Sequence, residues 1–445
     1  MSVFNRDSED EVARGARALV VRADVPGPGM RDAAARLDEA EGLALAIGIE
    51  VVWRESFRVR QIKPATLFGS GQAEQIAAQV AAHEAELVIV DNALSPVQQS
   101  NLEKAFGAKV IDRTGLILEI FGERAATNEG RLQVELAHLD YQAGRLVRSW
   151  THLERQRGGF GFLGGPGETQ IEADRRMIRD RMAKIRRELD QVTRTRGLHR
   201  ARRQRAPWPV IALVGYTNAG KSSLFNRMTG ADVMAQDMLF ATLDPTMRQI
   251  SLPGLDKAIL SDTVGFVSDL PTQLIAAFRA TLEEVVHADL IIHVRDIAHP
   301  DTEAQRADVM QVLAELGVSP EGQGDGAEAD ALAPAYIEAW NKIDLLHGEA
   351  RDDVLSAAAR RADVVPLSAV TGEGVDALRR AVADRMTQGS HVHRLTLSAQ
   401  DGASLAWLHE HGEVMGVEEQ GADGDALAVS VRLSDPAYAR FMARD

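Results

Sequence analysis

The sequence GYTNAGKS, which runs from Gly215 to Ser222, matches the phosphate-loop pattern G-x-x-x-x-G-K-[ST]. An apolar run of strand length, residues 210–214, comes before it, and residues 223–227 read as the start of a helix. In this strand–loop–helix context, backbone N–H groups can surround a polyphosphate. The pattern therefore predicts that Lys221 reaches the β- and γ-phosphates of a nucleotide and that the Ser222 hydroxyl binds Mg²⁺.

Three further segments follow in the order and approximate spacing of a GTPase domain of the translation-factor-like class. Residues 262–265, DTVG, match D-x-x-G, in which the carboxylate holds Mg²⁺ through water and the N–H of Gly265 senses the γ-phosphate. Residues 341–344, NKID, place Asp344 to accept hydrogen bonds from N1–H and the 2-amino group of guanine. Residues 368–369, SA, follow a strand-like run and would pack on the edge of the base. Together these segments predict guanine rather than adenine as the base.

The composition is that of an ordinary globular protein. The chain has 445 residues, of which 45% are hydrophobic and 26% charged, so we expect two to four domains. It contains no cysteine, which excludes disulfides and thiolate metal sites and fits a cytoplasmic location. It has no apolar run long enough for a transmembrane helix, and the N-terminus has no apolar segment typical of a signal peptide.

The charge is distributed unevenly. The formal net charge of −15 argues by itself against general affinity for nucleic acid. Residues 141–205, however, contain 17 Lys and Arg against 7 Asp and Glu. This segment is either a solvated helical face or a surface that attracts a polyanion such as RNA.

The hairpin predicted for residues 123–206 rests on two heptad series. Each series places its apolar residues on one face of a helix, and a breaker with six glycines and a proline, residues 158–167, separates them. The breaker carries Phe160, Phe162 and Leu163, and arginines flank it. It is either a floppy connector or a tip that inserts into a partner, where the rings could stack on unpaired bases. The series are Leu132, Leu136, Leu139, Ala143, Leu146, Trp150 and Leu153, and then Ile171, Ile178, Met182, Ile185, Leu189 and Val192.

The predicted fold is a multidomain α/β protein. We expect a disordered N-terminus (1–16), an N-terminal α/β domain with a parallel sheet (17–122), the basic helical hairpin (123–206), a P-loop GTPase domain (207–388) and a small C-terminal α+β domain (389–445). A glycine-bearing turn at residues 66–71 is read as a plain turn, with anion binding as the alternative, because no Lys-Ser/Thr pair follows it. Residues 319–334, rich in Gly, Asp and Glu, are predicted to be a disordered loop.

The chain resembles the HflX-type ribosome-associated GTPases over nearly its whole length. The resemblance rests on DRTGLIL at residues 112–118, on GPGETQIEADRR at 165–176 and on FATLDPT at 240–246, and the second of these is the most specific. It implies GTP-controlled binding to the large ribosomal subunit and its RNA, and the splitting of stalled or idle ribosomes. It also implies that the glycine-rich tip approaches the peptidyl-transferase region. The sequence departs from the family at Gln72, where many members carry a lysine, which weakens any claim of a second, ATP-type site.

Both Thr242 and Thr246 could supply a second Mg²⁺ ligand, and the resemblance favours Thr242. The residues expected to contact GTP or GDP lie in the four loops and in the switch around Thr242. They are Gly215, Tyr216, Thr217, Asn218, Ala219, Gly220, Lys221, Ser222, Phe240, Ala241, Thr242, Leu243, Asp244, Asp262, Thr263, Val264, Gly265, Asn341, Lys342, Ile343, Asp344, Ser368, Ala369 and Val370.

The catalytic machinery read from the sequence is incomplete. Small GTPases often place a glutamine directly after D-x-x-G to orient the attacking water, and here the residue is Phe266, so intrinsic hydrolysis should be slow. Lys221, Thr242, Gly265 and Asn218 are the expected catalytic residues, with Mg²⁺ on Ser222 and Thr242. Asn218 either holds a K⁺ ion that adds positive charge or only stabilises the loop.

Three functional readings follow. The first is a GTPase that splits ribosomes, and the second is a GTP-controlled ribosome- and RNA-binding module in which hydrolysis only resets binding. The third, an ATP-driven RNA remodeller, is opposed by Asp344 and by the lack of a second G-K-[ST]. We expect a cytoplasmic monomer, with peripheral membrane association left open.

Overall fold

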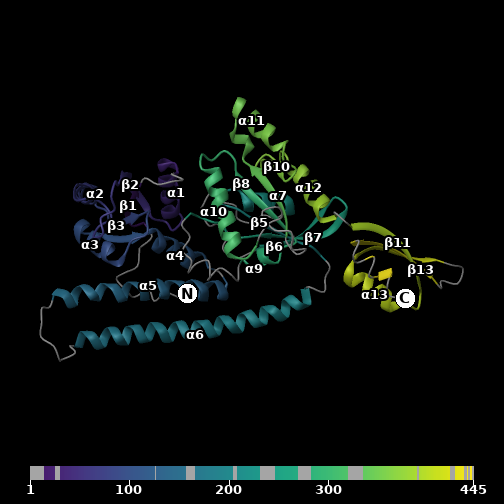
Figure 1. The fold of residues 1–445 in the computed structure, drawn as a ribbon, viewed down its shortest axis with the longest axis horizontal. Helices are drawn as coiled ribbons and strands as arrows, with labels where there is room; N and C mark the ends of the chain where they lie inside the picture. The colour runs from purple at the N-terminus through teal and green to yellow at the C-terminus, as the bar shows by residue number, and fades with distance from the viewer. Residues whose placement is uncertain are drawn as a thin grey trace.

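A computed structural model gives the fold of the chain (Figure 1). It describes residues 15–25, 31–125, 127–156, 166–203, 208–230, 246–268, 282–318, 334–387, 390–420, 426–434, 438 and 441–442. Several expected features lie outside these residues. They are nearly all of the N-terminal segment predicted to be disordered, most of the glycine-rich tip, the loop after residue 318, and the candidate residues Phe240, Ala241, Thr242, Leu243 and Asp244.

The N-terminal domain is built on a parallel sheet, as predicted. Its strand order is β2-β1-β3-β4, and all pairings are parallel. Apolar residues alternate between the faces: Val20 packs in one buried cluster and Val21 in another, as the two-residue period of a strand requires. The elements are β1 (Arg17–Asp24), α1 (Ala33–Leu45), β2 (Glu50–Arg58), α2 (Ser70–Ala82), β3 (Leu87–Val90), α3 (Pro96–Phe106), β4 (Lys109–Asp112) and α4 (Arg113–Arg124).

Two long helices, α5 (Asn128–Gln156) and α6 (Pro166–Arg203), run side by side in opposite directions and form the predicted hairpin, called the arm below (Figure 1). Met182 and Ile185 of the second heptad series are buried, and Arg181 pairs with Glu135 at 2.6 Å. Helix α5 also has a second buried face, which the heptad analysis did not predict. Val134 and Ala137 on this face pack into the core of the N-terminal domain.

The GTPase domain contains a six-stranded sheet of order β10-β9-β8-β5-β7-β6, in which β6 is antiparallel to β7 and the other pairings are parallel. Because the parallel strands end at the same edge, the loops that follow them meet there. The elements are β5 (Val210–Val214), α7 (Lys221–Thr229), β6 (Thr246–Leu252), β7 (Leu255–Asp262), α9 (Glu283–Val286), β8 (Leu290–Asp296), α10 (Thr302–Glu315), β9 (Ala335–Asn341), η1 (Ile343–Leu345), α11 (Gly348–Ala358), β10 (Val364–Pro366) and α12 (Val375–Thr387).

The C-terminal domain is a small α+β unit with its own core, as predicted. Its sheet order is β11-β13-β12, with antiparallel pairings, and Leu408, Val429 and Val431 are buried in it. The strand β12 was not predicted, because its sequence, EVMGVEEQ, contains a glycine and lacks a regular alternation. The elements are β11 (Ser390–Ser398), α13 (Gly402–His411), β12 (Glu413–Gln420) and β13 (Ala426–Ser434). None of the described helices combines the length and the apolarity needed to cross a membrane.

The N-terminal domain packs directly on the GTPase domain. One cluster of buried residues contains Leu37 and Ala40 of α1 together with Phe266 and Val267, which follow β7. Figure 1 shows α1 and α4 between the N-terminal sheet and the GTPase domain. The segment that follows the D-x-x-G motif is therefore part of an interdomain core.

Candidate nucleotide-binding site

The phosphate loop leaves β5 and enters α7 through backbone conformations that few residues adopt. Gly220 has φ 93°, and a Cβ there would lie 2.2 Å from Nδ2 of Asn341. A Cβ on Gly215 would lie 2.2 Å from the carbonyl oxygen of Val294. Both positions of the motif therefore require glycine for space as well as for conformation. Asn218 also has a positive φ, 59°, and its side chain is exposed.

Lys221 opens α7 and points back across the loop. Its Nζ donates to the carbonyl oxygens of Gly215 at 3.1 Å and Tyr216 at 2.8 Å. Burial lowers the pKa of Lys221 to about 8, while the negative charge of Asp262 opposes this shift. A buried ammonium group on a loop of this shape is suited to bind phosphate oxygens.

Ser222 and Asp262 form the candidate magnesium site. The Ser222 hydroxyl donates to Oδ2 of Asp262 at 2.7 Å, and these two oxygens come from the first turn of α7 and the end of β7. Hydroxyl and carboxylate oxygens are the ligands that Mg²⁺ prefers, so the residues present fit this ion. When bound, Mg²⁺ would neutralise charge on the β- and γ-phosphates.

The D-x-x-G segment is attached to the phosphate loop. The N–H of Phe266 donates to the Gly215 carbonyl at 3.1 Å, and the N–H of Thr217 donates to the Phe266 carbonyl at 2.7 Å. A Cβ on Gly265 would lie 3.0 Å from Nζ of Lys221, so Gly265 and the phosphate-binding lysine are neighbours. The Phe266 side chain is only 1% exposed and points into the interdomain core. It therefore cannot orient a water molecule at the phosphate.

The base-binding segments meet through Asn341. Its Nδ2 donates to the Ala219 carbonyl at 2.8 Å, and its Oδ1 accepts from the N–H of Ala369 at 2.9 Å, which links the phosphate loop to the segment at 368–370. Lys342 has φ 67° and pairs with Asp296 at 2.7 Å. Oδ1 of Asp344 is buried and has no hydrogen-bond partner among the described residues. An unsatisfied buried carboxylate oxygen at this place fits the donors of a guanine base.

The residues at 368–370 are held by a helix that the sequence analysis did not connect with the base. Arg227, in the last turn of α7, donates from Nε to the Ala369 carbonyl at 3.2 Å and from Nη2 to the Val370 carbonyl. Val370 is 72% exposed. Arg227 thus connects the helix behind the phosphate loop with the loop that should contact the base.

Gln72, which follows the glycine-bearing turn of the N-terminal domain, has a structural role. Its Oε1 accepts from the N–H of Gly69 at 3.0 Å, and its Nε2 donates to the Arg58 carbonyl at 3.0 Å. The amide therefore caps the N-terminus of α2 and ties it to β2.

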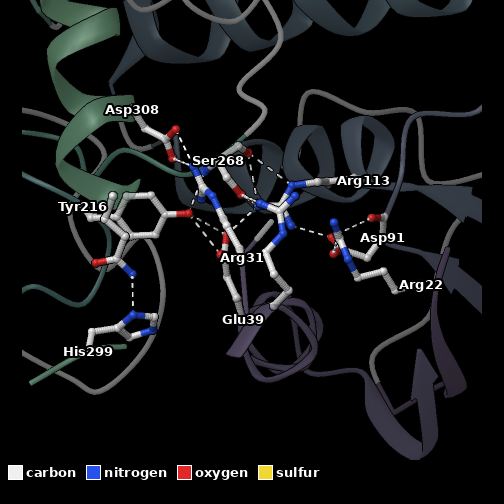
Figure 2. Close-up of polar contacts among 11 residues, drawn as sticks. Arg22, Arg31, Glu39, Asp91, Arg113, Tyr216, Ser268, His299 and Asp308 are labelled. Atoms are coloured by element: carbon white, nitrogen blue, oxygen red, sulfur yellow. Dashed lines mark hydrogen bonds and ion pairs between the residues drawn. The ribbon is translucent and has the colours of Figure 1, made fainter. Parts of the chain in front are cut away.

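Sequence reasoning missed a second set of residues around the site, drawn in Figure 2. Tyr216 donates from its hydroxyl to Glu39 of α1, at 3.1 and 3.0 Å to the two carboxylate oxygens. Arg113 of α4 reaches Ser268, which follows the D-x-x-G segment, at 2.8 Å. These partners are more than 150 positions apart in the sequence, so no local pattern could have paired them.

The mostly parallel six-stranded sheet, the phosphate loop and the three loops beside it define a P-loop GTPase. Models of four protein families match the chain: GTP-binding GTPase N-terminal (residues 34–122), GTP-binding GTPase Middle Region (124–203), 50S ribosome-binding GTPase (210–320) and HflX C-terminal domain (353–444). The chain belongs to the HflX family of GTPases, and it hydrolyses GTP.

Its relatives match over most of their length. The GTPase HflX of Magnetococcus marinus is 48% identical over 420 residues, which cover 93% of this chain and 92% of the relative. The GTPase HflX of Escherichia coli is 43% identical, over 85% of this chain and 88% of the relative. A solved GTP-binding protein of Sulfolobus solfataricus in complex with GDP aligns with 84% of this chain and 99% of its own, at 23% identity and a TM-score of 0.44.

Proposed function

We propose that this GTPase uses its nucleotide cycle to bind the large ribosomal subunit and to split stalled or idle ribosomes. The observation that carries the proposal is the basic arm, together with the match of the GTPase domain to a family described as 50S ribosome-binding. Arg179 and Arg186 of α6 lie seven residues apart, so they share one helical face, and both are exposed. Cationic side chains on an exposed helix attract the phosphates of RNA.

Within this proposal Lys221 and Gly265 contact the γ-phosphate, and Thr242 joins Ser222 on Mg²⁺ only while that phosphate is present. Asp344 reads guanine, and Ser368, Ala369 and Val370 border the base. Because Phe266 is buried, the group that orients the attacking water comes from elsewhere, and contact with the ribosome is the proposed source.

Asn218 is the proposed K⁺ ligand, so hydrolysis should be faster in K⁺ than in Na⁺ at equal ionic strength. Equal rates would leave Asn218 with a role in the loop only.

Co-sedimentation with purified large subunits tests the binding. The protein with a non-hydrolysable GTP analogue should sediment with the subunits, and the protein with GDP should not. Arg179→Gln combined with Arg186→Gln should weaken binding and its dependence on salt. The matched control is Arg360→Gln with Arg380→Gln, two exposed arginines of the GTPase domain, which change the net charge equally. If both pairs of substitutions weakened binding equally, the arm would not be the element that binds the large subunit.

A second experiment separates splitting by an enzyme cycle from binding that hydrolysis only resets. Intact ribosomes are mixed with the protein and either GTP or the non-hydrolysable analogue, and subunits are separated on a gradient. Splitting with the analogue favours the GTP-controlled binding module, whereas splitting with GTP alone favours a cycle driven by hydrolysis. The same measurement without the protein gives the spontaneous rate.

A further inference from the structure

Ser268 lies three residues after Gly265 and is enclosed by the N-terminal domain (Figure 2). It is 1% exposed, and each of its polar groups has a partner. The backbone N–H donates to the Tyr216 hydroxyl at 2.7 Å, and the side-chain oxygen accepts from Arg36 at 2.6 Å and from Arg113 at 2.8 Å. The carbonyl oxygen accepts two further bonds from Arg113, at 3.2 and 3.1 Å.

Arg113 is held rigidly at this contact. It is 3% exposed and pairs with Asp91, and with Glu39 at 2.5 Å. Burial alone would lower the pKa of Arg113, but the charges of Asp91 and Glu39 outweigh it and raise the pKa. A buried ion pair of this kind does not loosen gradually, since separating it leaves an unpaired charge in the interior. Any movement of Ser268 must therefore be followed by Arg113 or must break the network.

The preceding residue, Asp112, holds the arm. The Tyr141 hydroxyl of α5 donates to Oδ1 of Asp112 at 2.7 Å, and Arg145 donates from Nη2 to Oδ2 at 2.7 Å. The same carboxylate accepts from the backbone N–H groups of Gly115 at 2.8 Å and Leu94 at 3.0 Å, which fix it at the junction of β4 and α4. Two consecutive residues thus contact two distant parts of the chain.

These contacts lie at the carboxyl edge of the N-terminal sheet, where parallel α/β domains usually bind ligands. In this protein the groups bound there include Ser268 of the GTPase domain and Tyr141 of the arm. The buried carboxylates at this edge are paired within the chain, Asp91 with Arg22 and Arg113, and Asp112 with Arg145.

We propose that Asp112 and Arg113 are positioning residues that couple the segment from Gly265 to Ser268 with the arm helix α5. Gly265 responds to the γ-phosphate, and only Phe266 and Val267, which pack in the interdomain core, separate it from Ser268. A movement of Gly265 is therefore passed along the chain to Ser268. Arg113 transmits the shift to the start of α4, and Asp112 transmits it to Tyr141 and Arg145. The nucleotide then changes how the arm is held, and a contact on the arm changes the preference for GTP over GDP, since such coupling is reciprocal. The proposal rests on the proposed function only in taking the arm as the ribosome-binding element.

The test uses the full chain without ribosomes. Tyr141→Phe removes one hydrogen bond to Asp112 and contacts none of the residues assigned to the nucleotide. The dissociation constants of GDP and of a non-hydrolysable GTP analogue are measured by titration. A whole hydrogen bond to a charged group is worth about tenfold or more in an equilibrium constant. The ratio reports only the difference in this bond between the two nucleotide states, so it should change by about threefold to tenfold. An unchanged ratio would overturn the coupling.

Two matched controls accompany the test. Tyr336→Phe removes the hydroxyl that lies 2.7 Å from buried His293 inside the GTPase domain, and it should leave the ratio unchanged. At the other end of the network, Ser268→Ala should change the ratio. Ser261→Ala should not, because the buried hydroxyl of Ser261 has no partner among the described residues.

The double variant Tyr141→Phe, Ser268→Ala should change the ratio no more than the larger single change, because both act through one network. Independent, multiplying effects would contradict the proposal.

A measurement on the unmodified protein is independent of how the variants fold. Hydrogen exchange of residues 137–145 should differ between the GDP and GTP-analogue forms, and equal protection in both would overturn the coupling. Because neither measurement contains ribosomes, the coupling can fail while subunits still bind. Conversely, a changed ratio in a protein that does not split ribosomes would count against the proposed function alone.

Discussion

At the residue scale, Asp344 combines a buried carboxylate oxygen with the absence of any partner for it among the described residues. The prediction is that Asp344→Asn shifts base preference from guanine to xanthine, because an amide can donate where the carboxylate could only accept. Loss of two charge-assisted hydrogen bonds should weaken GDP binding about a hundredfold or more. Competition between GDP and XDP measures this, and Asp353→Asn on the exposed side of α11 serves as control. Unchanged guanine preference would show that another residue reads the base.

Lys221 gives a prediction about pH. Its pKa is lowered to about 8 by burial, against the charge of Asp262, and phosphate oxygens favour the charged amine. Below pH 8 the amine is already protonated, so binding needs no proton. Above pH 8 binding must take up a proton, and GDP affinity should fall by up to about tenfold per pH unit. Calorimetry at pH 7.0 and 8.8 in buffers of different ionisation enthalpy would detect the uptake, which Lys221→Met should abolish.

The nucleotide-binding motifs could be predicted from the sequence because the residues of each motif lie close together along the chain. The motif from Gly215 to Ser222 carries its strand, turn and helix within twenty residues. Ser268 and Glu39 were not readable, because a serine and a glutamate have no pattern of their own and their partners come from another domain. The roles assigned to the individual nucleotide-contacting residues stay predictions.

At the scale of elements, α7 supports the base-contacting segment, residues 368–370, through Arg227. We predict that Arg227→Ala weakens GDP binding by about twofold to tenfold, since two hydrogen bonds to the carbonyls of Ala369 and Val370 are lost at an exposed site. Equilibrium titration with a fluorescent guanine nucleotide measures the change. Arg379→Ala removes one hydrogen bond to the carbonyl of Ser251 in β6, a strand that carries none of the residues assigned to the base, and should have no effect. Equal GDP affinities for both variants would mean that the segment at residues 368–370 keeps its conformation without Arg227.

The arm shows which helix contacts a periodic sequence pattern predicts and which it does not. The heptad series predicted one seam between two helices, and Met182 and Ile185 are buried as it requires. It did not predict that Val134 and Ala137 would fill a second seam, because a helix that packs on two neighbours has no single period. The glycine-rich tip lies mostly outside the described residues, so its insertion into a partner stays a prediction.

At the scale of the whole molecule, deletion of residues 159–164 should abolish ribosome splitting and leave GTP binding unchanged. The arm helices can pair without these residues, which include Phe160, Phe162 and Leu163. The basic arm should still give a residual affinity for the large subunit that falls with salt. Gradient separation of subunits and co-sedimentation at two salt concentrations measure the two effects. Deletion of residues 321–326, in the segment predicted from the sequence to be a loop, is the control. Normal splitting by the tip variant would show that the tip is only a connector.

The apolar core that continues from α1 to Phe266 and Val267 has a consequence for thermal unfolding. A buried phenylalanine or valine side chain contributes about 1.5–3 kcal/mol, and here residues of both domains form the cluster that buries Phe266 and Val267. The N-terminal and GTPase domains should therefore melt together in one cooperative transition, separate from the C-terminal sheet with its own core. Calorimetry on the full chain would show two transitions rather than three. A fragment that begins at residue 207, the predicted start of the GTPase domain, would expose that apolar surface. It should melt at a lower temperature and aggregate more readily than the same residues in the full chain.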